Sequence, residues 1–213
     1  MSAEILGRKV GSFGYGLLGL TPRSLTLLNK YYAKYPEDAD KVVLNIKGAL
    51  RPGLIPDGSP KFVRQSAERC VEMLGGKGKI DMFECGRRDP NTPLEITIGA
   101  LEELEKEGKI GGVALSEVNG DTIRAAAKIT RIVAVEVEIS LISTEPLYNG
   151  IARTCAELNI PIIAGQIKSF DNIPEKDFRR ILPRFQPQNF DNNMKLVKRL
   201  ETLPKRRNAP QPS

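Results

Sequence analysis

The sequence of 213 residues contains no histidine and no tryptophan, and only 6% of its residues are aromatic. Without an imidazole, mechanisms that use a histidine base and metal sites that use a histidine ligand are excluded. The net charge is +6 and the pI about 9.2. The scarcity of aromatics and the lack of a recognised motif nevertheless argue against a nucleic-acid-binding protein. We therefore expect the acidic partner to be the phosphate groups of a small cofactor.

Long apolar runs and a leader-like segment are also missing. No apolar stretch approaches the ~20 residues that span a bilayer, and Met1–Leu6 lacks a basic region followed by an apolar one. The three cysteines, Cys70, Cys85 and Cys155, do not have the spacing of a metal site. Cys70 and Cys155 fall on apolar helix faces, which favours buried thiols over disulfides. Together these features predict a reduced, cytoplasmic setting with no membrane partner.

The most regular part of the chain is Leu101–Glu117, which predicts a helix, a tight turn and a strand. Apolar residues at helical spacing make up its first half, and Gly108 ends the helix. Ile110–Leu115 is then a short apolar run that becomes polar only at Ser116 and Glu117. A strand with so few polar residues is typical of a parallel sheet flanked by helices. Polar groups at the carboxyl end of such a strand lie where α/β folds place their chemistry.

The same unit recurs along the chain. We expect strands at 41–47, 80–85, 110–115, 132–140 and 160–164, and helices at 25–35, 60–74, 94–107, 121–129 and 146–158. Two of the helix starts carry capping signals, Ser59 before Pro60 and the capping box Thr92–Glu95. The alternation predicts repeated right-handed βα units in a parallel sheet.

The two ends depart from this rhythm. Val10–Leu20, with four glycines, predicts a short strand or hairpin. A phosphate-binding loop is disfavoured there, because the third glycine of the motif and the start of a helix are missing. Arg51–Pro60 predicts a loop, and beyond Gly165 only Asn192–Leu203 favours a helix. Residues 204–213 are expected to form a disordered tail.

Several polar residues stand where chemistry is expected. Lys47 ends a strand, where it could tune an acid or contact a cofactor phosphate, or could simply be solvated. Glu136 and Glu138 share one face of an apolar strand, so they must face water, a polar interior or partners. Paired carboxylates could also serve glycoside hydrolysis, but nothing else in the sequence supports this. Arg87–Pro90 could bind an anion, or could be a charged loop with Asp89 in a turn.

Five segments resemble the aldo-keto reductase family, and within it the pyridoxal reductase branch, in their order and spacing. They are Val42–Lys47, Ile80–Pro90, Gly108–Glu117, Val135–Glu138 and Cys155–Ile162. The resemblance covers roughly residues 5–200. It implies a (β/α)8 barrel that binds NADPH without a Rossmann motif and reduces aldehydes and ketones by hydride transfer. In that family an Asp, Tyr, Lys and His tetrad surrounds the carbonyl, and Tyr donates the proton.

The resemblance also implies the roles of particular residues. Lys47 matches the tetrad lysine and is the expected catalytic residue. Ser116 matches the serine that holds the nicotinamide carboxamide, while Glu117 and Glu136 stand where most members have Asn and Gln. With Gln166, these three residues are expected to bind NADPH. The expected substrate is a small carbonyl compound such as a pyridoxal-like aldehyde, with no nucleic acid, membrane or metal involved.

The chain departs from the family pattern at three places. The segment that carries the tetrad Asp and Tyr is missing after Leu20, Gly86 stands at the tetrad histidine, and the chain after Ala164 lacks the cofactor-covering loop and the final strand. We therefore predict an α/β fold, an incomplete (β/α)8 TIM barrel over residues 1–203 without strands two and eight. The expected function is an NADPH-dependent reductase. The alternatives are an impaired or inactive barrel remnant that binds or regulates a partner, and a defective product without a stable fold.

Overall fold

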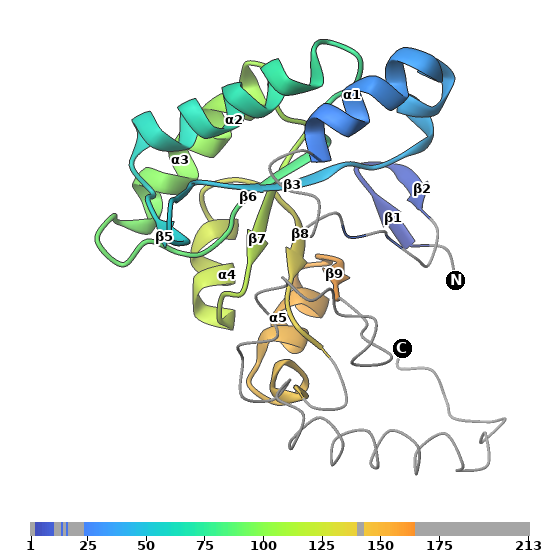
Figure 1. Ribbon diagram of the computed structural model, residues 1–213. Helices are drawn as coiled ribbons and strands as arrows, with labels where there is room; N and C mark the ends of the chain where they lie inside the picture. The colour runs from blue at the N-terminus through green and yellow to red at the C-terminus, as the bar shows by residue number, and fades with distance from the viewer. Residues whose placement is uncertain (1–2, 11–13, 15, 17–23, 140–142, 165–213) are drawn as a thin grey trace, which may run out of the picture.

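A five-stranded parallel sheet forms the centre of the computed structural model, which describes residues 3–10, 14, 16, 24–139 and 143–164 (Figure 1). Its strands lie side by side in chain order: β3 (Asn45–Gly48), β6 (Met82–Cys85), β7 (Val113–Ser116), β8 (Ile132–Glu136) and β9 (Ile162–Ile163). Every neighbouring pair is parallel. The predicted alternation of five strands with helices is therefore confirmed.

Helices cover one face of this sheet, which we call the outer face. They are α2 (Pro60–Leu74), α3 (Leu94–Lys106), α4 (Gly120–Ala127) and α5 (Ile151–Glu157), while α1 (Ser24–Lys34) packs against α2. Their apolar residues, such as Val63 and Leu101, join Phe83 and Val135 of the strands in one core. Two short 3₁₀ helices, η2 (Pro36–Lys41) and η3 (Glu145–Leu147), complete the helical segments in the described part of the chain.

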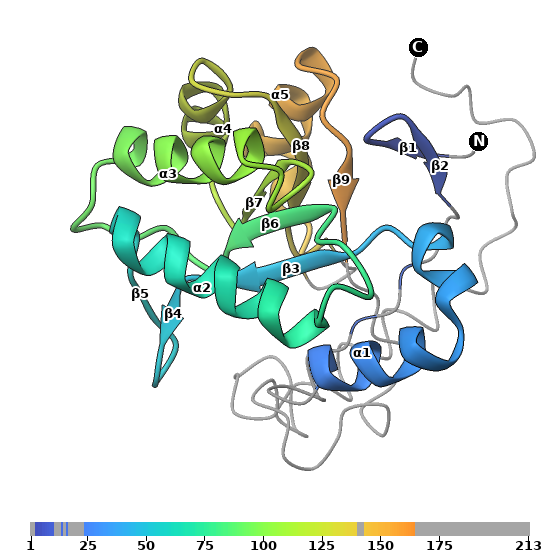
Figure 2. The ribbon, with the colours of Figure 1, turned by 90° about the horizontal axis from the view of Figure 1, so that it is seen from above.

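An antiparallel hairpin covers the amino ends of the strands on the opposite, inner face. It consists of β1 (Ala3–Ile5) and β2 (Arg8–Val10), and Ile5 packs with Met82 and Ala114 in a second, smaller core. Figures 1 and 2 show the hairpin on the other side of the sheet from α2 and α3. An ion pair of 3.0 Å between Arg8 and Asp81 ties it to the start of β6. The hairpin thus leaves uncovered the carboxyl ends of the strands on the inner face, where polar side chains lie.

Several predicted boundaries are wrong. The segment predicted as a loop contains a small antiparallel hairpin, β4 (Leu50–Arg51) with β5 (Ile55–Pro56). The helix predicted at 146–158 is divided into η3 and α5, because Gly150 adopts a left-handed φ of +92° between them. The strand predicted at 132–140 ends at 136, and the other four strands start later than expected. Local apolar runs extend beyond the residues that find hydrogen-bonding partners in the sheet.

The predicted helix caps also differ from those observed. Ser59 stands at the N-cap of α2 but its side chain makes no capping hydrogen bond. Thr92 does not cap α3, because its hydroxyl donates to Asp89 at 2.7 Å. The side-chain cap that does form is Asn119, whose Oδ1 accepts from the backbone N–H of Thr122 at 2.8 Å. A capping motif in the sequence is therefore overridden where a buried carboxylate competes for the hydroxyl.

Some expectations lie outside the described residues. They concern the hairpin beyond Val10, the cofactor residue Gln166, the helix predicted at 192–203 and the tail at 204–213. The lack of strands two and eight stays a prediction, as does the domain boundary at residue 203. In the part of the chain that the structure describes, no helix combines the length and apolarity needed to cross a membrane.

Candidate functional site

The polar residues of the inner face gather at the carboxyl ends of the strands. Because side chains alternate along a strand, residues next to the outward-facing Ile46, Phe83 and Val135 point inward. These inward residues are Asn45, Lys47, Glu84, Ser116 and Glu136. Register brings them together, since Lys47 lies opposite Glu84 and Ser116 lies opposite Glu136.

Lys47 is the centre of this group. Its Nζ lies 3.0 Å from Glu84 Oε1 and also contacts Glu136 Oε1. An ammonium group has three N–H donors, and these two contacts use two of them. The side chain is 32% exposed, so the third donor can face a ligand at the rim of the sheet. We call Asn45, Lys47, Glu84 and Glu136 the lysine cluster.

Glu84 is the member that the sequence analysis did not single out. Its side chain is fully buried, and Asn45 Nδ2 donates to its Oε1 at 3.1 Å. Burial raises the pKa of Glu84 to about 8, although Lys47 opposes the shift and Glu136 adds to it. The raised pKa favours the protonated, uncharged form of Glu84. The sequence did contain a signal for this residue. Glu84 lies two positions after Met82 and shares its face of an apolar strand, where a carboxyl group needs a partner.

Glu136 is the more exposed carboxylate of the cluster. Its side chain is 35% exposed, and its Oε2 accepts from Asn45 Nδ2 at 3.1 Å. Both carboxylates of the cluster therefore contact one ammonium group. The glycoside-hydrolase alternative requires instead two carboxylates, Glu136 and Glu138 in the sequence analysis, that flank a substrate, whereas Glu136 contacts Lys47 and Asn45. The geometry favours an acid-tuned lysine over that alternative.

Ser116 and Glu117 end β7 differently. Ser116 is 2% exposed, and its Oγ has no hydrogen-bond partner among the described residues. Glu117 adopts a left-handed φ of +51° and is exposed, and its carboxylate accepts from the backbone N–H of Glu138 at 2.9 Å. Since a buried hydroxyl normally finds a partner, Ser116 is the residue here that is suited to a ligand's polar group.

The loop after β6 holds a buried turn. Asp89 accepts from the backbone N–H of Gly58 at 3.0 Å and of Asn91 at 2.8 Å, in addition to the Thr92 hydroxyl. These bonds, the one from Gly58 first, hold the pKa of Asp89 below its usual value. The interpretation of Asp89 as a turn residue is confirmed. At Gly86, an added Cβ would lie 2.5 Å from Leu50 Cδ1, so a larger side chain there would displace Leu50.

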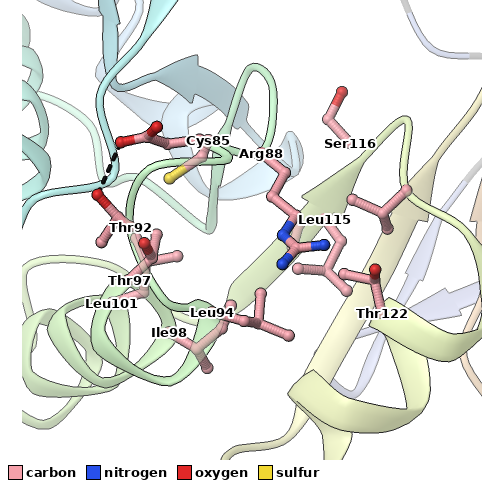
Figure 3. A pocket seen from close by; sticks show the side chains of 13 residues that line it. Cys85, Arg88, Thr92, Leu94, Thr97, Ile98, Leu101, Leu115, Ser116 and Thr122 are labelled. Atoms are coloured by element: carbon pink, nitrogen blue, oxygen red, sulfur yellow. Dashed lines mark hydrogen bonds between the residues drawn. The ribbon is translucent and has the colours of Figure 1, made fainter.

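A small cavity of about 30 Å³ lies on the outer side of β7, below Arg88. Figure 3 shows the Arg88 guanidinium reaching toward Thr122, while the Ser116 hydroxyl points away from the cavity. The walls are mostly apolar and come from α3 and the end of β7, for example Leu94, Ile98 and Leu115. This cavity is therefore separate from the lysine cluster and has about the size of one water molecule.

Known proteins show which family this chain is similar to. The family model described as the aldo/keto reductase family matches residues 21–208. A probable pyridoxal reductase 2 of Schizosaccharomyces pombe is 34% identical over 251 residues, which cover 92% of this chain and 75% of that protein. A putative pyridoxal reductase of Saccharomyces cerevisiae is 41% identical over 197 residues, which cover 84% of this chain and 56% of that protein.

Among solved structures, a glycerol dehydrogenase from Gluconobacter oxydans has a TM-score of 0.67 at 18% sequence identity. The alignment covers 84% of this chain and 58% of the dehydrogenase, and at this identity it concerns the fold alone. The chain thus spans between about half and three quarters of the length of these proteins. The parallel sheet and its outer helices therefore match part of the fold of this dehydrogenase.

Proposed function

Because this chain belongs to the aldo/keto reductase family, we propose that it is an oxidoreductase that reduces a small aldehyde or ketone with NADPH. The names of two relatives point to a pyridoxal-like aldehyde as substrate. The observation that carries the proposal is the meeting of Lys47 and Ser116 on one polar face at the carboxyl edge of the sheet. That edge is where parallel α/β barrels place their active sites.

The residues of this edge fit a nicotinamide. A carboxamide presents both a donor and an acceptor, and Ser116 Oγ is buried without a partner among the described residues. Glu117, Glu136 and Gln166 are proposed to line the same cofactor, Glu117 and Glu136 through neighbouring strand ends. When bound, NADPH supplies the hydride. The net charge of +6 favours its phosphate groups.

Lys47 is proposed to act on the carbonyl oxygen. Its third N–H faces the rim, so it can donate to the oxygen of a carbonyl group and stabilise the negative charge that develops there. Glu136 holds the ammonium in place from β8, and Glu84 holds it from β6. A hydrogen bond from a positioned acid contributes typically about 10²–10⁴-fold in rate.

A second candidate is cofactor binding without turnover. The specific observation that favours it is Gly86, where Leu50 occupies the space that a histidine side chain would need. A site that lacks this imidazole must protonate the substrate by another route, or not at all. Free thiols at Cys70, Cys85 and Cys155 agree with a reducing compartment for either candidate.

NADPH titration of the purified chain tests the proposal. Because the chain has no tryptophan, binding is best followed by the fluorescence of the cofactor itself or by calorimetry. We expect S116A to weaken NADPH binding by roughly 5- to 100-fold, the cost of one buried hydrogen bond. We expect K47M to lower pyridoxal turnover by roughly 10²–10⁴-fold with NADPH affinity nearly unchanged.

Glu102→Gln on α3 is the control, since among the residues that the structure describes the ion pair of this side chain is with Lys106 on the same outer helix. Binding without turnover would favour the second candidate. A cooperative melt with neither binding nor turnover would support a scaffold, and the lack of a cooperative melt would indicate a chain without a stable fold.

A further inference from the structure

Glu84 raises a question that the proposed function does not answer. It is the fully buried member of the lysine cluster, and its Oε2 has no partner among the described residues. Asn45 Oδ1 and Ser116 Oγ are also buried without a partner there, and all three belong to the same inner face. An ionised carboxylate with an unpaired oxygen is costly in such a place, whereas the protonated form carries no charge and costs less to bury.

The charges that face Glu84 come from two strands. Lys47 on β3 favours its ionised form, and Glu136 on β8 disfavours it. On β6 itself the neighbouring thiol is neutral, because burial raises the pKa of Cys85 to about 12. On β7 the partner of Phe83 is Val113, so the uncharged Ala114 is level with Glu84. With Glu84 neutral, Lys47 and Glu136 form a balanced pair, and ionisation of Glu84 would leave the cluster with a net negative charge.

Exposure separates the two carboxylates into different roles. The Glu136 side chain is 35% exposed, while the Glu84 side chain has no contact with solvent. From the rim inward, the order is therefore solvent, the lysine ammonium, and the buried acid. Glu84 is connected toward the rim through Lys47 at 3.0 Å, through the Asn45 amide at 3.1 Å and through a side-chain hydrogen bond with Glu136. Of these groups, Lys47 is the one that the proposed function places against the substrate oxygen. An amide does not carry a titrating proton, whereas an ammonium group does.

We propose that Glu84 is the proton reservoir of the site, holding the proton that replaces the one Lys47 gives to the substrate oxygen. This role rests on the proposed function, since it requires a carbonyl that is reduced. It supplies the protonation route that the tetrad tyrosine provides in the family. Glu84 is thus a positioning residue that acts through Lys47.

Reduction of the carbonyl group requires one hydride and one proton. The carbonyl carbon receives the hydride of NADPH, and the carbonyl oxygen receives one proton from the Lys47 ammonium as the O–H bond forms. Lys47, now an uncharged amine, takes the proton of Glu84, because a free amine is a stronger base than a carboxylate. Glu84 is left as a carboxylate and is reprotonated by a proton from bulk solvent before the next turnover, so each cycle takes up one hydride and one solvent proton.

Carbon-13 NMR of glutamate carboxyl groups tests the reservoir without any turnover. We expect one resonance, absent in E84Q, to titrate far above the ordinary range for glutamate. E136Q should move its midpoint down, because a neighbouring negative charge is removed, and K47M should move it up, because a positive charge is removed. A Glu84 resonance that titrates in the ordinary range would overturn the proposal, whatever the activity.

Kinetics tests the transfer. E84Q keeps the side-chain volume and the acceptor for Lys47 but cannot release a proton. We expect it to lower kcat at least tenfold and to leave NADPH affinity and KM close to those of the parent. In the parent chain, loss of the Glu84 proton should make kcat decline on the alkaline side, and E84Q should abolish this decline. E84D should restore part of the rate, and Glu102→Gln should change nothing.

The possible failures are distinguishable. Turnover in the parent chain with an unaltered pH profile in E84Q overturns the reservoir alone. Absence of NADPH binding and of turnover in the parent chain overturns the proposed function, and the reservoir with it. If E84Q fails to fold, the test still stands, because the resonance is then assigned by its opposite shifts in E136Q and K47M relative to the parent chain.

Discussion

At the scale of single residues, burial decides the chemistry of this protein more than residue type does. Glu84 and Glu136 are the same amino acid in contact with the same lysine. Burial raises the pKa of the fully buried Glu84, whereas the Glu136 side chain is 35% exposed. The difference in exposure of two chemically identical side chains is therefore the basis for proposing different roles for them.

This difference predicts how stability depends on pH. The folded chain keeps a proton on Glu84 up to pH about 8, whereas the unfolded chain releases it near the usual 4.5. Between these values the folded form binds more protons, so the free energy of unfolding falls as the pH rises, by at most about 1.4 kcal/mol per pH unit. Urea unfolding from pH 5 to 9 should show this slope in the parent chain and lose it in E84Q. Equal slopes in the two proteins would contradict the burial argument, and Glu102→Gln should retain the parent slope.

At the scale of elements, the ends of helices and strands are set by hydrogen bonds that the local pattern does not contain. Asp89 takes the Thr92 hydroxyl that was expected to cap α3, and it also holds Gly58 before α2. A single buried carboxylate therefore fixes the loop that joins β6 to α3 and the turn that precedes α2. By contrast, α4 keeps a simple local cap from Asn119.

The Asn119 cap can be tested by substitution. Asn119→Ala removes the acceptor for the Thr122 N–H, so it should lower the free energy of unfolding by about 1 kcal/mol. Chemical denaturation measures this change, with Lys61→Ala on the exposed side of α2 as a matched helix variant. The cap is not important to stability if both variants unfold at the same denaturant concentration.

At the scale of the whole molecule, Asp81 connects three parts of the chain. Its Oδ1 accepts from Arg8 at 3.0 Å, and its Oδ2 accepts from the backbone N–H of Leu44 at 2.8 Å. It therefore joins the hairpin of β1 and β2 and the chain entering β3 to the start of β6. Arg8 also donates to the carbonyl of Asp40. The inner face is closed at its amino end by these contacts.

Substitution of the two partners should have unequal effects. Asp81→Ala leaves the partly buried N–H of Leu44 unpaired and should cost roughly 1–3 kcal/mol. Arg8→Ala removes a side chain that is 28% exposed and should cost roughly 0–1 kcal/mol. Thermal and denaturant unfolding of both single variants and the double variant measures the difference. A larger loss from Arg8→Ala would show that the hairpin, and not the Leu44 bond, dominates.

The sequence by itself determined the five strands, their order, most of the helices and the places of Lys47 and Ser116. Periodicity and turn residues are local properties, so a short window of sequence is enough to reveal them. The tertiary structure alone decided that Glu84 is buried, that Glu136 meets Lys47, and that a terminal hairpin packs on the inner face. Asn45 reaches carboxylates 39 and 91 positions away, and at such separations burial and contact depend on how the sheet curves and packs. That is the physical reason why a lysine at a strand end could be found from the sequence, and its buried acid could not.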